Sequence, residues 1–237
     1  MKISYVIIFF LISTFAFALD SENEKFQGNN RVTVVGPFKK TLSKIIPKAK
    51  AGDPVSQYKL GQHYDYGWGV KKDLMEAARW YEKAATQNNL EAQHSLGLLY
   101  SGAGGYVFAN PKKAVKWFRA AALKGHSSSQ YFIGNAYKEG RGVLRNYSEA
   151  VKWYKKSAFQ GNGNAMHDIA VLYVKGLGVS KDLIKAYAWN NVSATQGWGN
   201  AKRYREILEK MMSREQLNKA QELSTKLYEK YGAEVKD

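Results

Sequence analysis

The chain contains no cysteine among its 237 residues. Disulfide bonds are therefore excluded as a source of stability, and so is attachment of a lipid at a cysteine. Catalytic signatures are also missing: there is no Gly-x-Ser-x-Gly nucleophile elbow, no His-Glu-x-x-His zinc motif and no Gly-rich phosphate loop ending in Lys-Ser/Thr. We therefore predict a protein that is not an enzyme, with no catalytic residue, no metal site and no cofactor.

Acidic residues are scarce in the middle of the chain. Between Ala92 and Arg205 there are 17 Lys and Arg residues but only four acids, a local net charge of +13, and the whole chain carries +16. A solvated polar face explains such charge in a repeat protein. Attraction to an acidic protein, an anionic lipid or an envelope glycan is the alternative, and both interpretations stay open.

The N-terminus has the features of a secretory signal peptide. A positive start at Lys2 is followed by an apolar run to Phe15 and by a small-x-small cleavage site, Ala16-Phe17-Ala18. An uncleaved membrane anchor is the alternative, because the segment from Ile3 to Leu19, 17 residues long, is at the lower limit for spanning a bilayer. The cleavage site favours removal of residues 1–18. We therefore expect an exported protein, periplasmic or secreted, that is not integral to the membrane after cleavage, and the lack of cysteine favours a bacterial periplasm or surface.

A motif returns about every 36 residues along the chain. Its tryptophan recurs as Trp80, Trp117, Trp153 and Trp189, at spacings of 37, 36 and 36 residues. A fixed period in this range indicates stacked supersecondary units that bury a continuous core between neighbours. We divide the chain into a signal peptide (1–18), a flexible leader (19–38), an N-terminal capping helix (39–52), four repeats (53–198) and C-terminal capping helices (199–237).

Each repeat is expected to contain two helices joined by a glycine loop. Glycine suits the loop because a helix end and a tight reversal need positive φ. The second helix begins at an Asp or Asn that can cap free backbone N–H groups, and pairs of small residues let neighbouring helices approach closely. The loop glycines are Gly67, Gly69, Gly140, Gly142, Gly176 and Gly178, the caps are Asp73, Asn110, Asn146 and Asp182, and the small pairs are Ala84-Ala85, Ala121-Ala122 and Ser157-Ala158.

Three segments depart from the period. Residues 31–38 suit a short strand or an extended segment, and the helix that follows carries Pro47, which would kink or shorten it. The loop of the second repeat, residues 102–108, is one residue longer and is expected to expose aromatic side chains. After the fourth repeat we expect two final helices, 201–212 and 213–231, the second opened by a capping box at Ser213.

Residues 60–85 carry the fullest copy of the motif, Leu-Gly-x-x-Tyr-x-x-Gly-x-Gly-Val-x-x-Asp, followed by Ala-x-x-Trp-Tyr-x-x-Ala-Ala. This pattern resembles the Sel-1-like repeat family, a close relative of the tetratricopeptide repeats, over residues 51–198. The resemblance implies an all-α fold, a right-handed α-solenoid of stacked antiparallel helix pairs. It also implies an adaptor whose concave surface, lined by the first helices, binds a protein or peptide.

One register position alternates between tyrosine and histidine. Three residues before the motif glycine, or the alanine of the fourth repeat, the chain has Tyr58, His94, Tyr131 and His167 in turn. Packing and partner contact both explain this ladder. The two histidines are two repeats apart, on the order of 20 Å, which excludes a shared metal ion. By correspondence with tetratricopeptide groove positions, the resemblance implies these partner-contacting residues: Tyr58, Gln62, His94, Tyr131, Asn135, His167 and Lys175.

Aromatic and basic residues together would suit a nucleic-acid groove. The chain has six Trp, 16 Tyr and 36 Lys and Arg residues. However, the repeating Trp residues occupy the core register of the second helices, so most should be buried, and export removes the usual nucleic-acid partners. We therefore predict a non-enzymatic scaffold of the bacterial envelope or host-contact surface that binds a protein or peptide in its groove, and the basic charge suits an acidic partner. The alternative is binding of peptidoglycan, lipopolysaccharide or lipid through the basic face.

Overall fold

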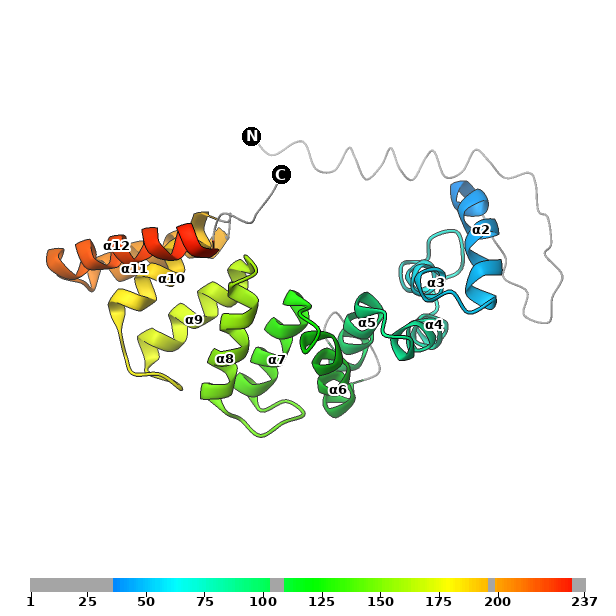
Figure 1. Cartoon of the computed structure of the whole chain (residues 1–237), viewed down its shortest axis with the longest axis horizontal. Helices are drawn as coiled ribbons and strands as arrows, with labels where there is room; N and C mark the ends of the chain where they lie inside the picture. Colours follow the sequence, from blue (N-terminus) through cyan, green and yellow to red (C-terminus); the bar gives the residue numbers. More distant parts are fainter. Residues whose placement is uncertain (1–35, 103–108, 196–198, 232–237) are drawn as a thin grey trace. The chain divides into compact units, whose positions relative to one another are not determined.

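The computed structural model describes residues 36–102, 109–195 and 199–231, and every element in these ranges is helical (Figure 1). The elements are η1 (Gly36–Phe38), α2 (Lys39–Lys50), α3 (Pro54–Tyr66), α4 (Leu74–Thr86), α5 (Leu90–Ser101), α6 (Pro111–Ala122), α7 (Ser127–Glu139), α8 (Tyr147–Ala158), α9 (Gly163–Lys175), α10 (Leu183–Thr195), α11 (Gly199–Lys210) and α12 (Arg214–Tyr231). The all-α prediction is confirmed for the described residues. The expected signal peptide, residues 19–35 and most of the long loop of the second repeat lie outside them.

The helices form two compact units that divide between Ala92 and Gln93, near the start of α5. In the N-terminal unit, α3 packs against α2 on one side and α4 on the other. Pro47 lies inside α2, which ends three residues later, and Leu42, Ile45 and Ala49 face a cluster with Leu60 of α3. In the C-terminal unit, the helices from α6 to α10 pack in chain order.

The predicted caps of the second helices are confirmed. Each side-chain oxygen accepts a hydrogen bond from a backbone N–H two or three residues further on, which satisfies a donor that the helix leaves free. The bonds are Asp73 to Met75 and Glu76 (2.9 and 3.0 Å), Asn110 to Lys113 (3.0 Å), Asn146 to Glu149 (3.1 Å) and Asp182 to Lys185 (2.9 Å).

The first helices have a cap column of their own, which the sequence analysis did not identify. The capped N–H groups belong to the residues three positions on, at distances of 2.8 to 3.1 Å. The capping residues are Asp53, Asn89, His126 and Asn162. In the third repeat the cap is therefore an imidazole nitrogen instead of a carboxylate or amide oxygen.

The predicted glycine loops are also confirmed, with φ between 65° and 76° at all six positions. Two of these glycines are needed for a second reason. A Cβ on Gly142 would lie 2.3 Å from the carbonyl oxygen of Pro111, and one on Gly178 would lie 2.4 Å from the carbonyl carbon of Tyr147. The loop of one repeat therefore rests directly on the start of the second helix of the preceding repeat.

Inside each of the first three repeats, an aromatic ring of the second helix lies on the glycine of the first. A Cβ added to Gly61, Gly97 or Gly134 would come within 2.4 to 2.5 Å of the ring of Tyr81, Phe118 or Tyr154, respectively. The fourth repeat changes both partners together. Ala170 replaces the glycine, and the smaller Asn190 stands where Tyr154 stands in the third repeat. The methyl group of Ala170 therefore occurs in the repeat that lacks the aromatic ring at this position.

The expectation that most of the repeating tryptophans are buried needs correction. Trp153 and Trp189 are buried, but Trp80 and Trp117 are only half-buried. In the first three repeats the fully enclosed residue is the next one, since Tyr81, Phe118 and Tyr154 are 1%, 3% and 0% exposed. Three of the tryptophans also have a lysine over the ring: Lys83 on Trp80, Lys116 on Trp117 and Lys156 on Trp153.

The C-terminal helices pack on the last repeat. Both α11 and α12 pack against α10, and the predicted capping box opens α12 through reciprocal bonds between Ser213 and Gln216 of 3.0 and 3.2 Å. Tyr231 at the end of α12 stacks on Phe159, with ring centroids 4.1 Å apart. Within the described segments, no helix has the length and apolar character needed to cross a bilayer.

We predict that Gly134→Ala destabilises the wild-type protein but not a Tyr154→Asn variant. In the wild type the new methyl group meets the ring of Tyr154 at 2.5 Å, and overpacking of this kind costs about 1–3 kcal/mol. In the Tyr154→Asn background the ring is absent, as in the fourth repeat. There Gly134→Ala should stabilise the protein by up to about 1 kcal/mol, because alanine has a higher helix propensity than glycine.

Guanidinium titrations of the four proteins give the free energies of unfolding for this double-mutant cycle. An equal cost of Gly134→Ala in both backgrounds would show that the glycine is not required by the ring.

Candidate functional site

The seven predicted groove residues are divided between the two units. Tyr58 and Gln62 lie on α3, where the Gln62 amide donates a 2.9 Å hydrogen bond to the Tyr58 hydroxyl. The Tyr58 ring also packs on Tyr81, with centroids 5.7 Å apart. His94, Tyr131, Asn135, His167 and Lys175 lie in the C-terminal unit, on α5, α7 and α9.

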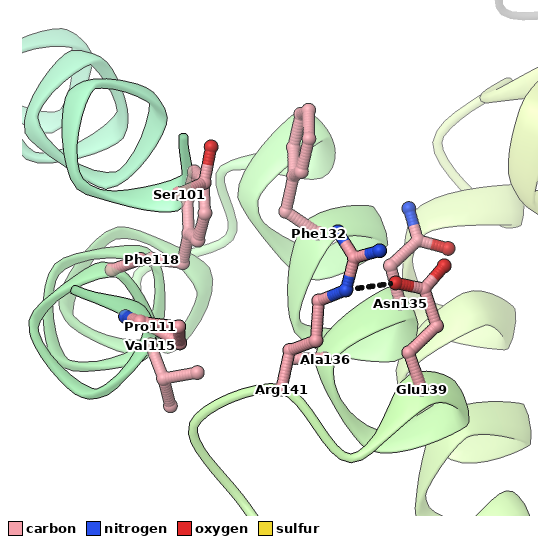
Figure 2. A pocket seen from close by; sticks show the side chains of 10 residues that line it. Ser101, Pro111, Val115, Phe118, Phe132, Asn135, Ala136, Glu139 and Arg141 are labelled. Carbon is pink, nitrogen blue, oxygen red and sulfur yellow. Dashed lines mark ion pairs between the residues drawn. The ribbon is translucent and has the colours of Figure 1, made fainter. Parts of the chain in front are cut away.

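A pocket of about 150 Å³ opens between α6 and α7 in the C-terminal unit. Figure 2 shows Phe118 of α6 on one side and Phe132 of α7 on the other, and Val115 and Asn135 also line the pocket. The rings of Phe118 and Phe132 are stacked, 4.8 Å apart and within 7° of parallel. The pocket therefore has an aromatic wall that comes from two consecutive helices.

The polar side of the pocket consists of Asn135, Glu139 and Arg141. The Arg141 Nε donates to a Glu139 carboxylate oxygen at 2.8 Å, the ion pair drawn in Figure 2. Both side chains are exposed, so the pair contributes little to stability. It does place one donor group and one acceptor group at the mouth of an apolar pocket.

Asn135 is held by the core of its own repeat. The Tyr154 hydroxyl donates a 2.6 Å hydrogen bond to Asn135 Oδ1. Burial raises the pKa of Tyr154, with smaller contributions from Asp168, Tyr131 and Glu139, so the hydroxyl stays protonated and remains a donor. Because Oδ1 is fixed toward Tyr154, the Asn135 amide nitrogen is left to donate to other groups.

Tyr131 stands beside this pair and links α7 to α9. Its ring packs on Tyr154 at 5.7 Å, and burial raises the pKa of its hydroxyl, with Asp168 adding to the increase. Lys138 of α7 donates a 2.9 Å hydrogen bond to the Asp168 carboxylate of α9. These side chains form a half-buried polar group across two first helices.

His94 lies in a cluster with His126 and Ser129. The two imidazole rings are 4.7 Å apart, and the Ser129 hydroxyl lies 2.9 Å from Nδ1 of each ring. His126 Nδ1 also accepts the Ser129 N–H, so this nitrogen is unprotonated. Burial, with His126 as a second cause, lowers the pKa of His94 to about 4.

His167 and Lys175 are placed differently. His167 Nδ1 lies 2.9 Å from Asn190 Oδ1, and its ring packs edge-on against Tyr204 at 5.1 Å, so helices α10 and α11 cover part of it. Lys175 is exposed at the last residue of α9. Groove contact by either residue stays a prediction.

Phe132, which the sequence analysis missed, lies next to three of the predicted residues. The Phe132 ring packs on His94 and on Tyr131, at 5.6 and 5.7 Å, and lines the pocket with Asn135. Lys138, Asp168 and Arg141 were missed as well. The sequence did contain a signal for Phe132. The equivalent positions of the other repeats hold polar residues, Lys59, Ser95 and Asp168, so an aromatic residue at this position is unusual.

Across the described residues, no group of three or more His, Asp and Glu side chains is arranged to hold a metal ion. His94 and His126 lie close together, but they occupy different positions of the repeat. The sequence analysis compared only equivalent positions of the repeats and therefore did not pair these two histidines.

The family profile described as Sel1 repeat matches residues 54–89, 90–126, 127–162 and 163–197. The chain is similar to c5321, a protective antigen of uropathogenic Escherichia coli displaying an SLR fold, with 36% identity and a TM-score of 0.75 over 81% of this chain and 41% of that one. It is also similar to a Sel1 repeat protein from Oxalobacter formigenes, with 30% identity, a TM-score of 0.68, and coverage of 84% and 88%. These structures confirm the α-solenoid fold class.

A curated relative is the ERAD-associated E3 ubiquitin-protein ligase component HRD3B of Arabidopsis thaliana. It is 31% identical over 100 residues, which cover 42% of this chain and 15% of the relative. The chain matches 24% or less of the lengths of the first curated relatives. The activities and partners of those longer proteins therefore do not transfer directly.

We predict that stability falls as the pH decreases from about 6.5 to about 4, and that His94→Gln reduces this loss. The folded pKa of His94, about 4, is below its unfolded value, so the unfolded state binds more protons in this window. The contribution of His94 is complete above pH 6.5 and is lost on acidification, by roughly 2 kcal/mol after allowing for partial exposure.

Urea titrations between pH 4 and pH 8 measure this difference, with His167→Gln as the control. Identical pH profiles for the wild type and His94→Gln would contradict the assignment.

Proposed function

This chain belongs to the Sel1-repeat family, and on that premise we propose that it is an interaction scaffold that holds a segment of a partner protein against α7 and its neighbours. Sel1-repeat proteins are generally protein–protein interaction scaffolds, and they are mostly non-catalytic adaptors. The name of the plant relative, a ligase component, is consistent with such a role.

The pocket between α6 and α7 is the observation that carries the proposal. Its volume of about 150 Å³ is similar to that of an apolar cavity that accepts a benzene molecule. One apolar side chain of the partner would pack against the wall formed by the stacked rings of Phe118 and Phe132. Such an anchor in a small desolvated pocket is the usual centre of an interface.

The polar groups around the pocket suit the backbone of the bound segment. Asn135 has an amide nitrogen with two N–H groups, one of which serves the neighbouring Tyr131 hydroxyl, and the Arg141–Glu139 pair supplies a donor and an acceptor at the mouth. The half-buried group formed by Tyr131, Lys138 and Asp168 extends the polar surface toward α9. A few oriented polar groups around an apolar pocket are typical of a binding site.

We also propose that the scaffold acts outside the cytoplasm. The support is in the sequence: a basic start, an apolar run and the Ala16-Phe17-Ala18 cleavage site. Bacterial envelope or host-contact surface is then the expected compartment.

A second candidate function is binding of anionic envelope material. The excess of basic residues between Ala92 and Arg205 supports it. The two functions differ in their response to salt, because exposed charge interactions are screened within about 10 Å at 0.1 M salt, whereas apolar packing in the pocket persists.

We predict that a photo-crosslinking amino acid at position 132 captures the partner, and that one at position 144 does not. Phe132 lines the pocket, whereas Leu144 is 91% exposed in a loop of the same repeat. The double variant Tyr131→Ala/Asn135→Ala should weaken capture by about tenfold or more, since it removes the polar contacts beside the anchor.

The measurement is crosslinking in living cells followed by mass spectrometry, with circular dichroism to confirm that each variant is folded. Equal capture from both positions, or undiminished capture by a folded double variant, would disprove this placement. Capture from a cell lysate that disappears when the salt is raised to 0.5 M would instead support the anionic alternative.

We predict that the mature protein begins at Leu19. Cleavage after Ala18 removes the positive start and the apolar run. N-terminal sequencing of the protein from a periplasmic or culture fraction tests this, with Ala18→Arg as the variant that blocks cleavage. A full-length chain held in the membrane fraction of wild-type cells would show that the segment is an anchor.

A further inference from the structure

A second groove lies in the N-terminal unit, between α2 and α3. Its volume is about 570 Å³, several times that of the pocket in the other unit. The lining side chains that matter are Lys40, Lys44 and Lys48 of α2, Lys59 and Gln62 of α3, and Trp68 just after α3. This groove includes Gln62, one of the predicted partner-contacting residues, but it shares no lining residue with the pocket between α6 and α7.

The groove is strongly basic. Among the residues that the structure describes, no acidic one lines it. In the part of the chain that the structure describes, none of its four lysines forms an ion pair. The nearest acid in sequence, Asp53, caps α3, and its pKa is lowered chiefly by hydrogen bonds from Ser56 with a smaller effect of Lys48. Four like charges at one groove therefore favour an anionic ligand.

The lysines of α2 are regularly spaced. Lys40, Lys44 and Lys48 are four residues apart, so they share one helix face and follow each other at about 6 Å along the axis. In an extended polypeptide, alternate side chains point to the same side and recur every ~6.6–6.8 Å. Carboxylates on alternate residues of an extended segment would therefore face successive lysines.

An aromatic platform ends the groove. Trp68 is 43% exposed, and its ring stacks on Tyr66 at 4.6 Å and on Phe38 at 6.3 Å. Its backbone is also fixed, because His63 Nδ1 lies 2.6 Å from the Trp68 carbonyl oxygen. The platform offers a rigid apolar contact beside the cationic row.

We propose that the groove between α2 and α3 binds an extended acidic polypeptide segment with Asp or Glu at alternate positions and an apolar residue at one end. The carboxylates pair with Lys40, Lys44 and Lys48 from one side, and Lys59 adds charge from the other. The apolar residue packs on Trp68. The Gln62 amide, whose NH₂ group already donates to Tyr58, still has a carbonyl oxygen that can accept a backbone N–H.

A polypeptide fits this groove better than a nucleic acid does. Single strands bind through aromatic side chains that stack successive bases, and here one tryptophan lies at one end of the lysine row. The spacing of the lysines matches alternate residues of a strand, and partners of Sel1-repeat proteins are proteins.

The test uses the mature chain and a fluorescein-labelled peptide of five Glu-Thr pairs followed by Leu-Phe. The comparison peptide has the same composition with all five Glu residues contiguous. Binding is measured by fluorescence anisotropy at 0.15 M salt. We expect the alternating peptide to bind about tenfold more tightly, because only its carboxylates match the lysine spacing.

The key variant is Lys40→Gln/Lys44→Gln/Lys48→Gln, and its control is Lys50→Gln/Lys71→Gln/Lys72→Gln. Both remove three exposed charges from the same unit, and the control residues do not line the groove. We expect an affinity loss of about tenfold or more for the first and about twofold or less for the second, since non-specific attraction responds only to net charge. Trp68→Ala should weaken binding about fivefold through loss of aromatic contact area.

Equal losses in the two triple variants, or equal binding of the two peptides, would overturn the proposal. Tighter, Lys40-, Lys44- and Lys48-dependent binding of polygalacturonate, of a single-stranded oligonucleotide or of phosphatidylglycerol vesicles would overturn the peptide as the occupant. None of these variants touches the pocket between α6 and α7, so failure here does not affect the proposed scaffold function.

Discussion

The close contact between a glycine and an aromatic ring determines how each of the first three repeats is built. The first helix can approach the second only because Gly61, Gly97 and Gly134 have no side chain, and the rings of Tyr81, Phe118 and Tyr154 fill the space. The fourth repeat tests the rule within the same protein, since Ala170 is paired with the smaller Asn190. The loop glycines then fix where the next repeat begins, so stacking within the C-terminal unit follows from the same small-residue constraint.

The same core residues position the binding surface. The Tyr154 ring is buried, but its hydroxyl reaches Asn135 at the edge of the pocket, and the Tyr81 hydroxyl reaches the buried Asp65 at 3.2 Å in the first repeat. The hydroxyl of a buried tyrosine needs a hydrogen-bond acceptor, and in both repeats that acceptor lies on the first helix. The packing that stabilises a repeat therefore also orients the side chains that face a ligand, and the pocket could not change without affecting the core.

Sequence reasoning worked where the physics is local. Caps such as Asn146 and loop glycines such as Gly140 act within a few residues, so their spacing predicts their role. It failed where neighbours come from another helix. Trp80 and Trp117 were expected in the core with the other repeating tryptophans, yet the adjacent Tyr81 and Phe118 take that place. The rotation of the second helix depends on which of its rings packs on the glycine of the first helix. The tryptophan and the residue after it are both aromatic, so the sequence does not show which of the two that ring is.

The repeat period can be read directly from the amino-acid sequence, and so can the helical class, the loops and the second-helix caps, because the last three depend on backbone preferences within one turn or one loop. The packing of the helices was needed to show that Phe132 joins His94, Tyr131 and Asn135 around a pocket, and that His126 caps α7 beside His94. It was also needed to show that the lysines of α2 line a groove with Trp68. These groups come from different helices, and their meeting depends on how side chains fill the space between helices, which a one-dimensional pattern does not contain.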